Sequence, residues 1–355
     1  MFRDDFVWGV ASSAYQVEGT DPEDGRGKCV WDVFTEEGHI HENQNAYTAC
    51  DHMHRYKEDY ALGIKAYRFS MNWARILPEG TGRVNEKAIA MYRDMIVTMK
   101  ENGITPYITM FHWELPQALQ VKGGWLNPQI VDWFGEYARV IAENFADLCD
   151  YFITINEPQC VVGLGHLSAV HAPGVKHTVT DTFQIAHNLL KAHGQAVINL
   201  RKYAGRPIKI GYAPTGGVAY PYTDSPEDIE AARRADGYLN RWFIEPIMLG
   251  RYPQDMVELY QKAGVVLPAF KPEDLALMHQ KLDFVGLNYY NDFWVKNSKN
   301  TFRIFPKRIW SLSISLLILW DRIFITVTSC GPERMENRSS STGRRAFQGR
   351  RQAGL

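Results

Sequence analysis

The chain of 355 residues is long enough to bury one large core or two ordinary ones, and its apolar and charged fractions, 45% and 22%, are typical of globular proteins. A formal net charge of -1 gives no reason to expect nucleic acid or an acidic membrane as a partner. The charge is uneven, because residues 296–355 hold twelve of the 39 Lys and Arg but only three of the 40 Asp and Glu. This segment therefore carries +9 and residues 1–295 carry -10, which predicts a folded domain over 1–295 and an atypical basic tail over 296–355.

The five cysteines form no CxxC pair and are odd in number. This pattern favours reduced thiols in a cytoplasmic protein over a disulfide framework or a metal site. The N-terminal residues lack a basic stretch followed by an apolar one, so we predict no secretory signal.

Short apolar runs and helical spacing alternate along residues 6–287. Six runs predict strands, at 6–12, 65–70, 105–111, 148–155, 208–215 and 283–287. Helices are predicted over 51–62, from a cap at Asn85 to Gly103, from Asn127-Pro128 onward, and over 182–203 and 228–248. Residues 20–45, rich in Gly, Asp and Glu, are predicted to form a long loop. The alternation indicates a parallel sheet with helical crossovers.

Polar side chains follow these strands where each one ends. A carboxylate at the end of a buried strand, such as Glu157, is costly to bury unless it has a partner or a task, although a solvated turn residue is the alternative. A buried Arg68 needs an anion, which either a structural ion pair or a second carboxylate in a site would supply. Gln16 and His112 fit sugar hydroxyls, although each taken alone is more often a loop cap or a core histidine. The full set is Gln16, Arg68, His112, Asn156, Glu157, Asn288 and Tyr290.

A doubly wound sheet gathers its ligand residues at one switch point, whereas polar residues at every strand end are typical of a closed (β/α)8 barrel. We therefore predict an α/β fold of the TIM-barrel class, with chemistry at the C-terminal ends of the strands.

Five motifs, in the order AYQVEG, YRFSMNWARI, FHWELP, TINEP and GLNYY, resemble glycoside hydrolase family 1, the β-glucosidase family, over about residues 5–294. The resemblance implies a retaining mechanism on β-linked sugars, in which Glu157 matches the general acid/base. It also implies that Arg68 and Tyr290 hold the carboxylate of the nucleophile. The implied sugar-binding residues are Gln16, His112, Trp113, Asn156, Asn288 and Tyr290.

The tail departs from the family's pattern. The family's nucleophile is the Glu of a TENG-type motif after the seventh strand, and the nearest match, Glu336-Asn337, follows no apolar run and precedes Arg338 instead of Gly. The Trp and the Glu-Trp pair that the family uses for the 4- and 6-hydroxyls are also missing. The change of composition after Trp294 predicts a shifted reading frame or a truncated gene model, about six β/α units, and a poorly ordered tail. A basic appendage that binds nucleic acid is the alternative reading of the tail.

Two functions remain open at this point. The first is a β-glucosidase-type hydrolase that removes terminal β-linked glucose or a related sugar from a small glycoside or oligosaccharide. The second is a catalytically impaired fragment that binds sugar but lacks the nucleophile. Neither requires a metal or an organic cofactor, because proton transfer and carboxylate attack need none. The sugar specificity and the oligomeric state do not follow from the sequence.

Overall fold

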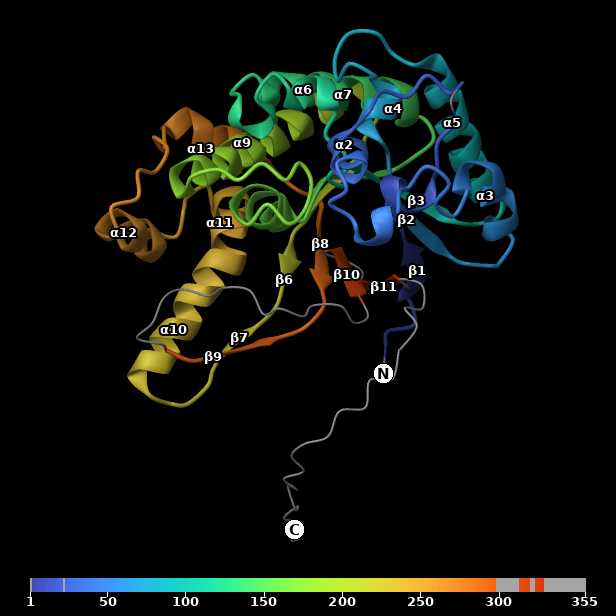
Figure 1. The fold of residues 1–355 in the computed structure, drawn as a ribbon. Coiled ribbons are helices and arrows are strands. Elements are labelled where there is room, and N and C mark those ends of the chain that lie inside the picture. Colours follow the sequence, from blue (N-terminus) through green and yellow to red (C-terminus); the bar gives the residue numbers. More distant parts are fainter. Residues whose placement is uncertain (1, 22, 298–312, 320–322, 329–355) are drawn as a thin grey trace, which may run out of the picture.

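The computed structural model describes residues 2–21, 23–297, 313–319 and 323–328. Its main sheet contains six strands that follow one another along the chain, each parallel to the next. The sheet curves into a barrel with helices outside it (Figure 1), which confirms the predicted TIM-barrel class. The six strands are β1 (Val7–Ala11), β2 (Ala66–Ser70), β3 (Thr105–Phe111), β4 (Tyr151–Asn156), β5 (Lys209–Ala213) and β8 (Phe284–Tyr289).

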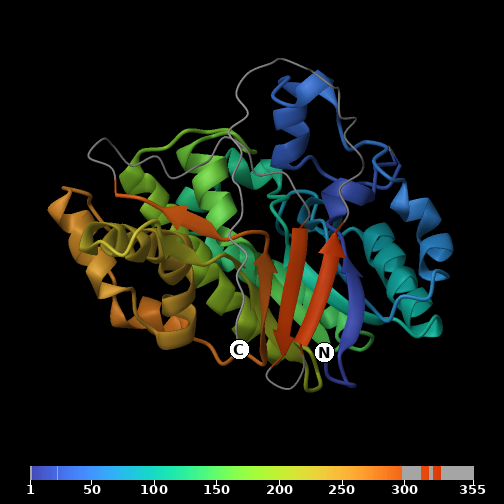
Figure 2. The same ribbon diagram turned by 90° about the horizontal axis from the view of Figure 1, so that it is seen from below.

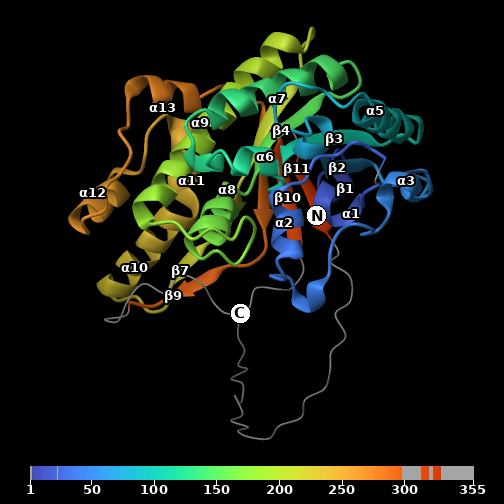
Figure 3. The same cartoon turned by 45° about the horizontal axis from the view of Figure 1, so that its top comes forward.

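Helical crossovers join these strands and pack around the outside of the sheet (Figure 3). Residues with helical spacing form the buried faces, as in Ile130–Phe145, where Phe134, Ala138, Ile141 and Phe145 are all buried. The longer helices are α2 (Val30–Glu36), α3 (His52–Tyr60), α5 (Glu86–Glu101), α7 (Ile130–Phe145), α9 (Val179–Tyr203), α10 (Pro226–Asp236), α11 (Trp242–Leu249), α12 (Gln254–Lys262) and α13 (Pro272–Met278). The short α-helices and the 3₁₀- and π-helices are α1 (Ala14–Val17), η1 (His41–Asn43), α4 (Trp73–Ile76), α6 (Gln117–Gln120), η2 (Gly124–Leu126), α8 (Pro158–Cys160), η3 (Val161–Leu167) and η4 (Gly237–Arg241).

One local prediction was wrong, and the structure adds detail to two others. Residues 20–45 are not only loop, because helix α2 begins at Val30 with a capping box between Cys29 and Asp32. Residues 228–248 are helical throughout, as predicted, and the π-helical turn η4 joins α10 to α11 within this stretch. Asn85 is at the N-cap position of α5, as predicted, although its side chain makes no capping hydrogen bond; its amide donates to the carbonyls of Asp24 and Arg75.

Two further strands complete the ring of the main sheet. Strand β10 (Ser313–Leu319) is antiparallel to both β8 and β11 (Ile323–Thr328), and β11 is parallel to β1. Figure 2 shows β8 (orange), β10 and β11 (red) and β1 (blue) side by side in this order. Three residues join β10 to β11, which is too short for the helical crossover of a β/α unit. The remainder of the predicted tail lies outside the described residues.

The short strands β6 (Thr215–Gly216), β7 (Ala219–Pro221) and β9 (Phe293–Val295) lie beyond the ends of β5 and β8. Strand β6 pairs with β8, and β7 pairs with β9 in a separate two-stranded sheet.

The strands point alternate side chains inward and outward. A small cluster, whose members come from five successive strands of the ring, consists of Ala66, Tyr107, Ile153, Ala213 and Phe284. It fills the barrel interior, while a larger apolar cluster joins the strands to the helices. The inner cluster lies below the polar residues described next.

Candidate active site

Strand alternation points Arg68 and Asn288 into the barrel. Arg68 lies two residues after Ala66 on β2, and Asn288 lies four residues after Phe284 on β8. Since every second residue of a strand faces the same side, both polar side chains share the inner face with the apolar cluster. Their exposed fractions are 6% and 2%, so the sequence has placed a cation and an amide deep in the barrel.

A β-bulge brings Asn156 to the same interior. The register between β4 and β5 shifts between Ile153 and Asn156, so Asn156 faces inward three residues after Ile153 instead of two or four. Glu157 follows with a left-handed φ of 43°, and Pro158 then begins helix α8. A left-handed backbone is unfavourable for a residue with a Cβ, and such strain recurs at active sites as well as in tight loops.

Five side chains meet in one hydrogen-bonded cluster. The Arg68 guanidinium donates to Asn288 Oδ1 at 2.9 Å and to Asn156 Oδ1 at 2.5 Å. The Asn288 amide donates to Asn156 Oδ1 at 2.6 Å and to Glu157 Oε1 at 2.7 Å. The Tyr290 hydroxyl donates to the same Glu157 oxygen at 2.5 Å. Residues from three distant parts of the chain therefore surround one carboxyl group.

Burial shifts the pKa values of this cluster. Glu157 is 2% exposed, and burial raises its pKa above the usual range even though hydrogen bonds from Tyr290, Cys160 and Asn288 act in the opposite direction. Burial also lowers the pKa of Arg68 to about 10, against the opposing charge of Glu157. A carboxyl group with a raised pKa retains its proton closer to neutral pH, as a general acid must.

His112 and Trp113 border the cluster on the β3 side. The Asn156 amide lies 3.1 Å from His112 Nε2, and the Trp113 indole donates to the Asn156 carbonyl at 3.0 Å. Burial, together with the charge of Arg68, lowers the pKa of His112 to about 3, so the imidazole is neutral. With Nε2 accepting from the amide, Nδ1 carries the proton, and this buried Nδ1 has no partner among the described residues. This N–H is therefore a buried donor without an acceptor in the described structure.

Gln16 lies apart from this cluster. It is exposed on helix α1, and its side chain makes no hydrogen bond to the described part of the chain. Its backbone is nevertheless tied to the site through Glu114, which the sequence analysis did not single out. The Glu114 carboxyl accepts from the backbone N–H of Tyr15 at 3.1 Å and of His112 at 3.2 Å. Burial raises the pKa of Glu114 to about 8.

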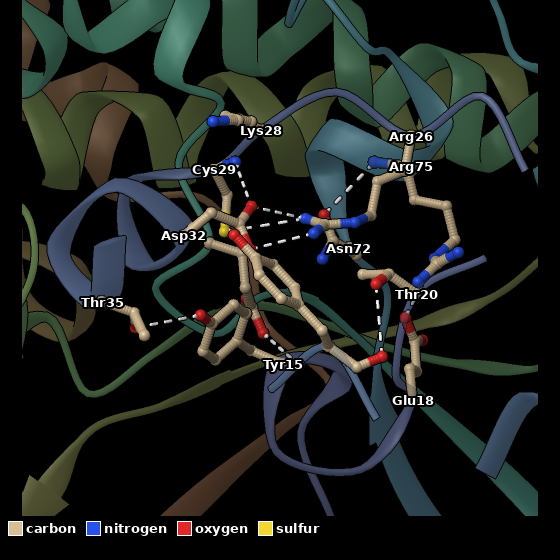
Figure 4. Close-up of polar contacts among 12 residues, drawn as sticks. Tyr15, Glu18, Thr20, Arg26, Lys28, Cys29, Asp32, Thr35, Asn72 and Arg75 are labelled. Atoms are coloured by element: carbon tan, nitrogen blue, oxygen red, sulfur yellow. Dashed lines mark hydrogen bonds and ion pairs between the residues drawn. The ribbon is translucent and has the colours of Figure 1, made fainter. Parts of the chain in front are cut away.

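A network of buried ion pairs fixes the chain that follows α1 (Figure 4). Arg75 donates to Glu18 at 3.1 Å, to the carbonyl of Gly19 at 2.7 Å and to Asp24. Figure 4 also shows Arg26 against Asp32, a pair with N–O distances of 2.7 and 2.9 Å. These contacts hold the segment after β1 against α4, and with it the backbone that carries Gln16.

The geometry of Arg68 and Tyr290 differs from what the resemblance implied. Both were expected to hold a second carboxylate, but Tyr290 contacts Glu157 itself and Arg68 contacts three neutral side-chain oxygens, those of Thr109, Asn156 and Asn288. Over the described ranges, Glu157 is the one carboxylate that contacts the clustered residues. Glu336 lies outside the described residues.

The barrel carries a buried carboxyl group, an arginine and amides at the C-terminal ends of its parallel strands. This arrangement is typical of a barrel enzyme. The family model for glycosyl hydrolase family 1 matches residues 1–309, and the chain belongs to this family. It is 43% identical to β-glucosidase A of Acetivibrio thermocellus and 45% identical to β-glucosidase A of Thermotoga maritima, in each case over 83% of this chain. The chain spans 66% of the length of each of these relatives.

Solved structures agree with this assignment. The family 1 β-glucosidase from Thermotoga maritima matches with a TM-score of 0.80 and 43% identity, over 84% of this chain and 68% of that one. The same enzyme in complex with deoxynojirimycin matches with a TM-score of 0.77 and 45% identity, over 81% of this chain and 66% of that one. Within the described residues, no helix is long and apolar enough to cross a membrane.

Proposed function

We propose that this chain is a retaining β-glycosidase of the β-glucosidase type, in which Glu157 is the general acid/base. The observation that carries the proposal is the environment of the Glu157 carboxyl group. It is buried at the end of β4, its pKa is raised by burial, and polar side chains that can bind sugar hydroxyls surround it. Such a group can protonate the departing glycosidic oxygen and later activate a water molecule.

The proposed substrate is a terminal β-linked glucose, or a related sugar, in a small glycoside or oligosaccharide. The relatives named β-glucosidase and the Thermotoga maritima structures in complex with deoxynojirimycin and glucoimidazole support this choice. The available His112 Nδ1–H and the amide of Asn156 suit neighbouring hydroxyls, and the Trp113 ring suits the apolar face of a sugar. Gln16, Asn288 and Tyr290 complete the proposed sugar-binding set.

Sugar binding without efficient turnover is a second candidate. A retaining mechanism needs a second carboxylate about 5–5.5 Å from the acid. Arg68 is the cation expected beside that carboxylate, and in the described structure its guanidinium contacts neutral oxygens instead. If the second carboxylate is missing from the site, Glu157 can still donate a proton but no glycosyl-enzyme intermediate forms.

A cytoplasmic location is part of the same proposal. Cys29, Cys50, Cys149 and Cys160 are all unpaired thiols in the described structure, which agrees with a reducing compartment.

Hydrolysis of two β-glucosides with different leaving groups tests the proposal. Activated 4-nitrophenyl β-D-glucoside needs little help from an acid, whereas an alkyl β-glucoside needs much. We expect Glu157→Gln to reduce turnover of the alkyl substrate by about 10²–10⁴-fold and that of the nitrophenyl substrate by less. Equal effects on both substrates, or none, would contradict the role of Glu157.

Added azide separates the two candidates. A small anion can replace a missing nucleophile if the sugar pocket and the acid are in place. Turnover without azide supports the complete hydrolase, and turnover that requires azide supports the sugar-binding candidate. Absence of both turnover and sugar binding would contradict the complete hydrolase and the sugar-binding candidate alike.

A further inference from the structure

The two oxygens of Glu157 have different surroundings. Oε1 accepts from the Tyr290 hydroxyl and from the Asn288 amide, so both of its lone pairs are engaged. Oε2 contacts one other side chain, the thiol of Cys160, whose Sγ lies 3.2 Å away. In the neutral carboxylic acid the proton must therefore reside on Oε2, because Oε1 has no position left for it. Oε2 is consequently the oxygen from which a proton can be given to a ligand.

The local backbone places Cys160 beside this oxygen. Pro158 begins helix α8 directly after Glu157, and Cys160 lies three residues after Glu157, one helical turn away. The Cys160 backbone N–H donates to the Glu157 carbonyl at 3.0 Å, which closes that turn. Glu157 is the N-cap of this turn, and the Cys160 thiol lies back against its carboxyl group. Cys160 also lines a cavity together with Trp113 and His171.

We propose that Cys160 is a positioning residue for Glu157, whose thiol fixes the orientation of Oε2 and stabilises the carboxylate that remains after proton transfer. The inference rests on the proposed function for the acid role of Glu157. In the step concerned, the Oε2–H bond of Glu157 breaks as the proton bonds to the glycosidic oxygen, and the electron pair remains on Oε2. The thiol keeps its own proton throughout, and its hydrogen bond becomes stronger as its acceptor becomes charged.

The contact acts in both directions. The Cys160 hydrogen bond opposes the rise in the Glu157 pKa, while burial and the charge of Glu157 together raise the pKa of the Cys160 thiol well above its ordinary value. The other titratable groups that act on Glu157 are Arg68 from β2 and Tyr290 after β8. Among Glu157, Arg68 and Tyr290, the carboxylate is Glu157. Replacing it with a neutral group should therefore make the Cys160 thiol more acidic and more reactive.

Alkylation of the thiols tests this coupling without requiring turnover. The intact chain is treated with iodoacetamide in alkaline solution, at a pH where the Glu157 carboxyl group is ionised, and the labelling rate of each cysteine is followed by mass spectrometry of its peptide. We expect Glu157→Gln to accelerate labelling of Cys160 by roughly tenfold for each unit by which the thiol pKa falls. Buried Cys149, which contacts the carbonyls of Pro106 and Tyr151, serves as the control for unfolding, and exposed Cys50 serves as the control for reagent. An unchanged Cys160 rate, with both controls unchanged, would overturn the proposal.

A pair of variants tests the positioning role in turnover, with azide added if it is required. Cys160→Ala removes the donor, whereas Cys160→Ser keeps one. We expect Cys160→Ala to lower kcat with little change in KM and to move the basic limb of the kcat/KM profile to higher pH, because the Glu157 pKa rises. Cys160→Ser should restore most of the kcat and return the basic limb of the pH profile close to its original position. Identical pH profiles for Cys160→Ala and the unaltered chain would contradict the proposal. Failure of turnover alone would count against the proposed function and leave the alkylation result to decide the coupling.

Discussion

Removing the buried Arg75 guanidinium should destabilise the fold more than removing an arginine that forms an ion pair at the surface. Arg75 and Glu18 are 1% and 3% exposed, and Arg75 also contacts Asp24 and the carbonyl of Gly19. In Arg75→Met the Glu18 carboxylate keeps only the hydrogen bond from Tyr92, at 2.7 Å, while it remains buried. Breaking one side of a buried pair costs about 3–5 kcal/mol, which is a large part of the roughly 5–15 kcal/mol that stabilises a typical protein.

Urea unfolding followed by tryptophan fluorescence measures this loss. The variant Arg75→Met/Glu18→Gln should regain part of the stability, because no charge is then left unpaired between these two positions. Arg139→Met is the matched control, since its pair with Glu143 lies at the surface, with side-chain exposures of 37% and 40%. The control should lose about 0–1 kcal/mol. An Arg75→Met variant as stable as the Arg139→Met variant would refute the reasoning.

Three other changes have defined outcomes. Tyr290→Phe should raise the pKa of Glu157 further, because it removes the hydroxyl donor to Oε1. ¹³C NMR of labelled carboxyl groups measures this pKa, with Glu157→Gln used to assign the signal. A lower Glu157 pKa in the variant would contradict the account. Glu114→Gln should reduce the loss of stability between about pH 4.5 and pH 8, because over this range the unfolded chain has released the Glu114 proton while the folded chain, with a pKa of about 8, still holds it. Equal pH slopes in urea unfolding for Glu114→Gln and the unaltered chain would exclude that effect. Gly194→Ala should lower the free energy of unfolding by about 1–3 kcal/mol, because the added Cβ would lie 1.8 Å from the Leu277 carbonyl oxygen. A melting temperature equal to that of the unaltered chain would contradict this prediction, since the chain around Gly194 and Leu277 would then move apart at no cost.

Local patterns in the sequence predicted the strands well, because burial and alternation are properties of neighbouring residues. Strand β3 has the predicted bounds, and β2 and β4 end within one residue of theirs. Helix α2 was missed because it is short and follows a stretch rich in Gly and Asp, although its Val30 and Phe34 are spaced four apart and are both buried. The π-helical turn at Gly237 was not predicted, because such a turn leaves the apolar spacing of the helix around it almost unchanged.

The site was predictable where a strand end points a side chain inward. Arg68, Asn156, Glu157 and Asn288 were singled out in this way and lie together. The partners of each were not predictable, because contacts across the barrel join residues more than a hundred positions apart, as between Glu157 and Tyr290. The bulge that turns Asn156 inward is likewise a property of the pairing between β4 and β5 rather than of either strand alone. The roles assigned to these residues stay predictions.

The position of a bound sugar analogue tests the central claim most directly. The claim is that the inner cluster around Glu157 is a sugar site. In a crystal of the intact chain soaked with deoxynojirimycin, we predict the ring between Trp113 and Glu157, with a hydroxyl on His112 Nδ1 and another on the Asn156 amide. A fully occupied ligand elsewhere on the molecule, with the Glu157 cluster unchanged, would contradict the account.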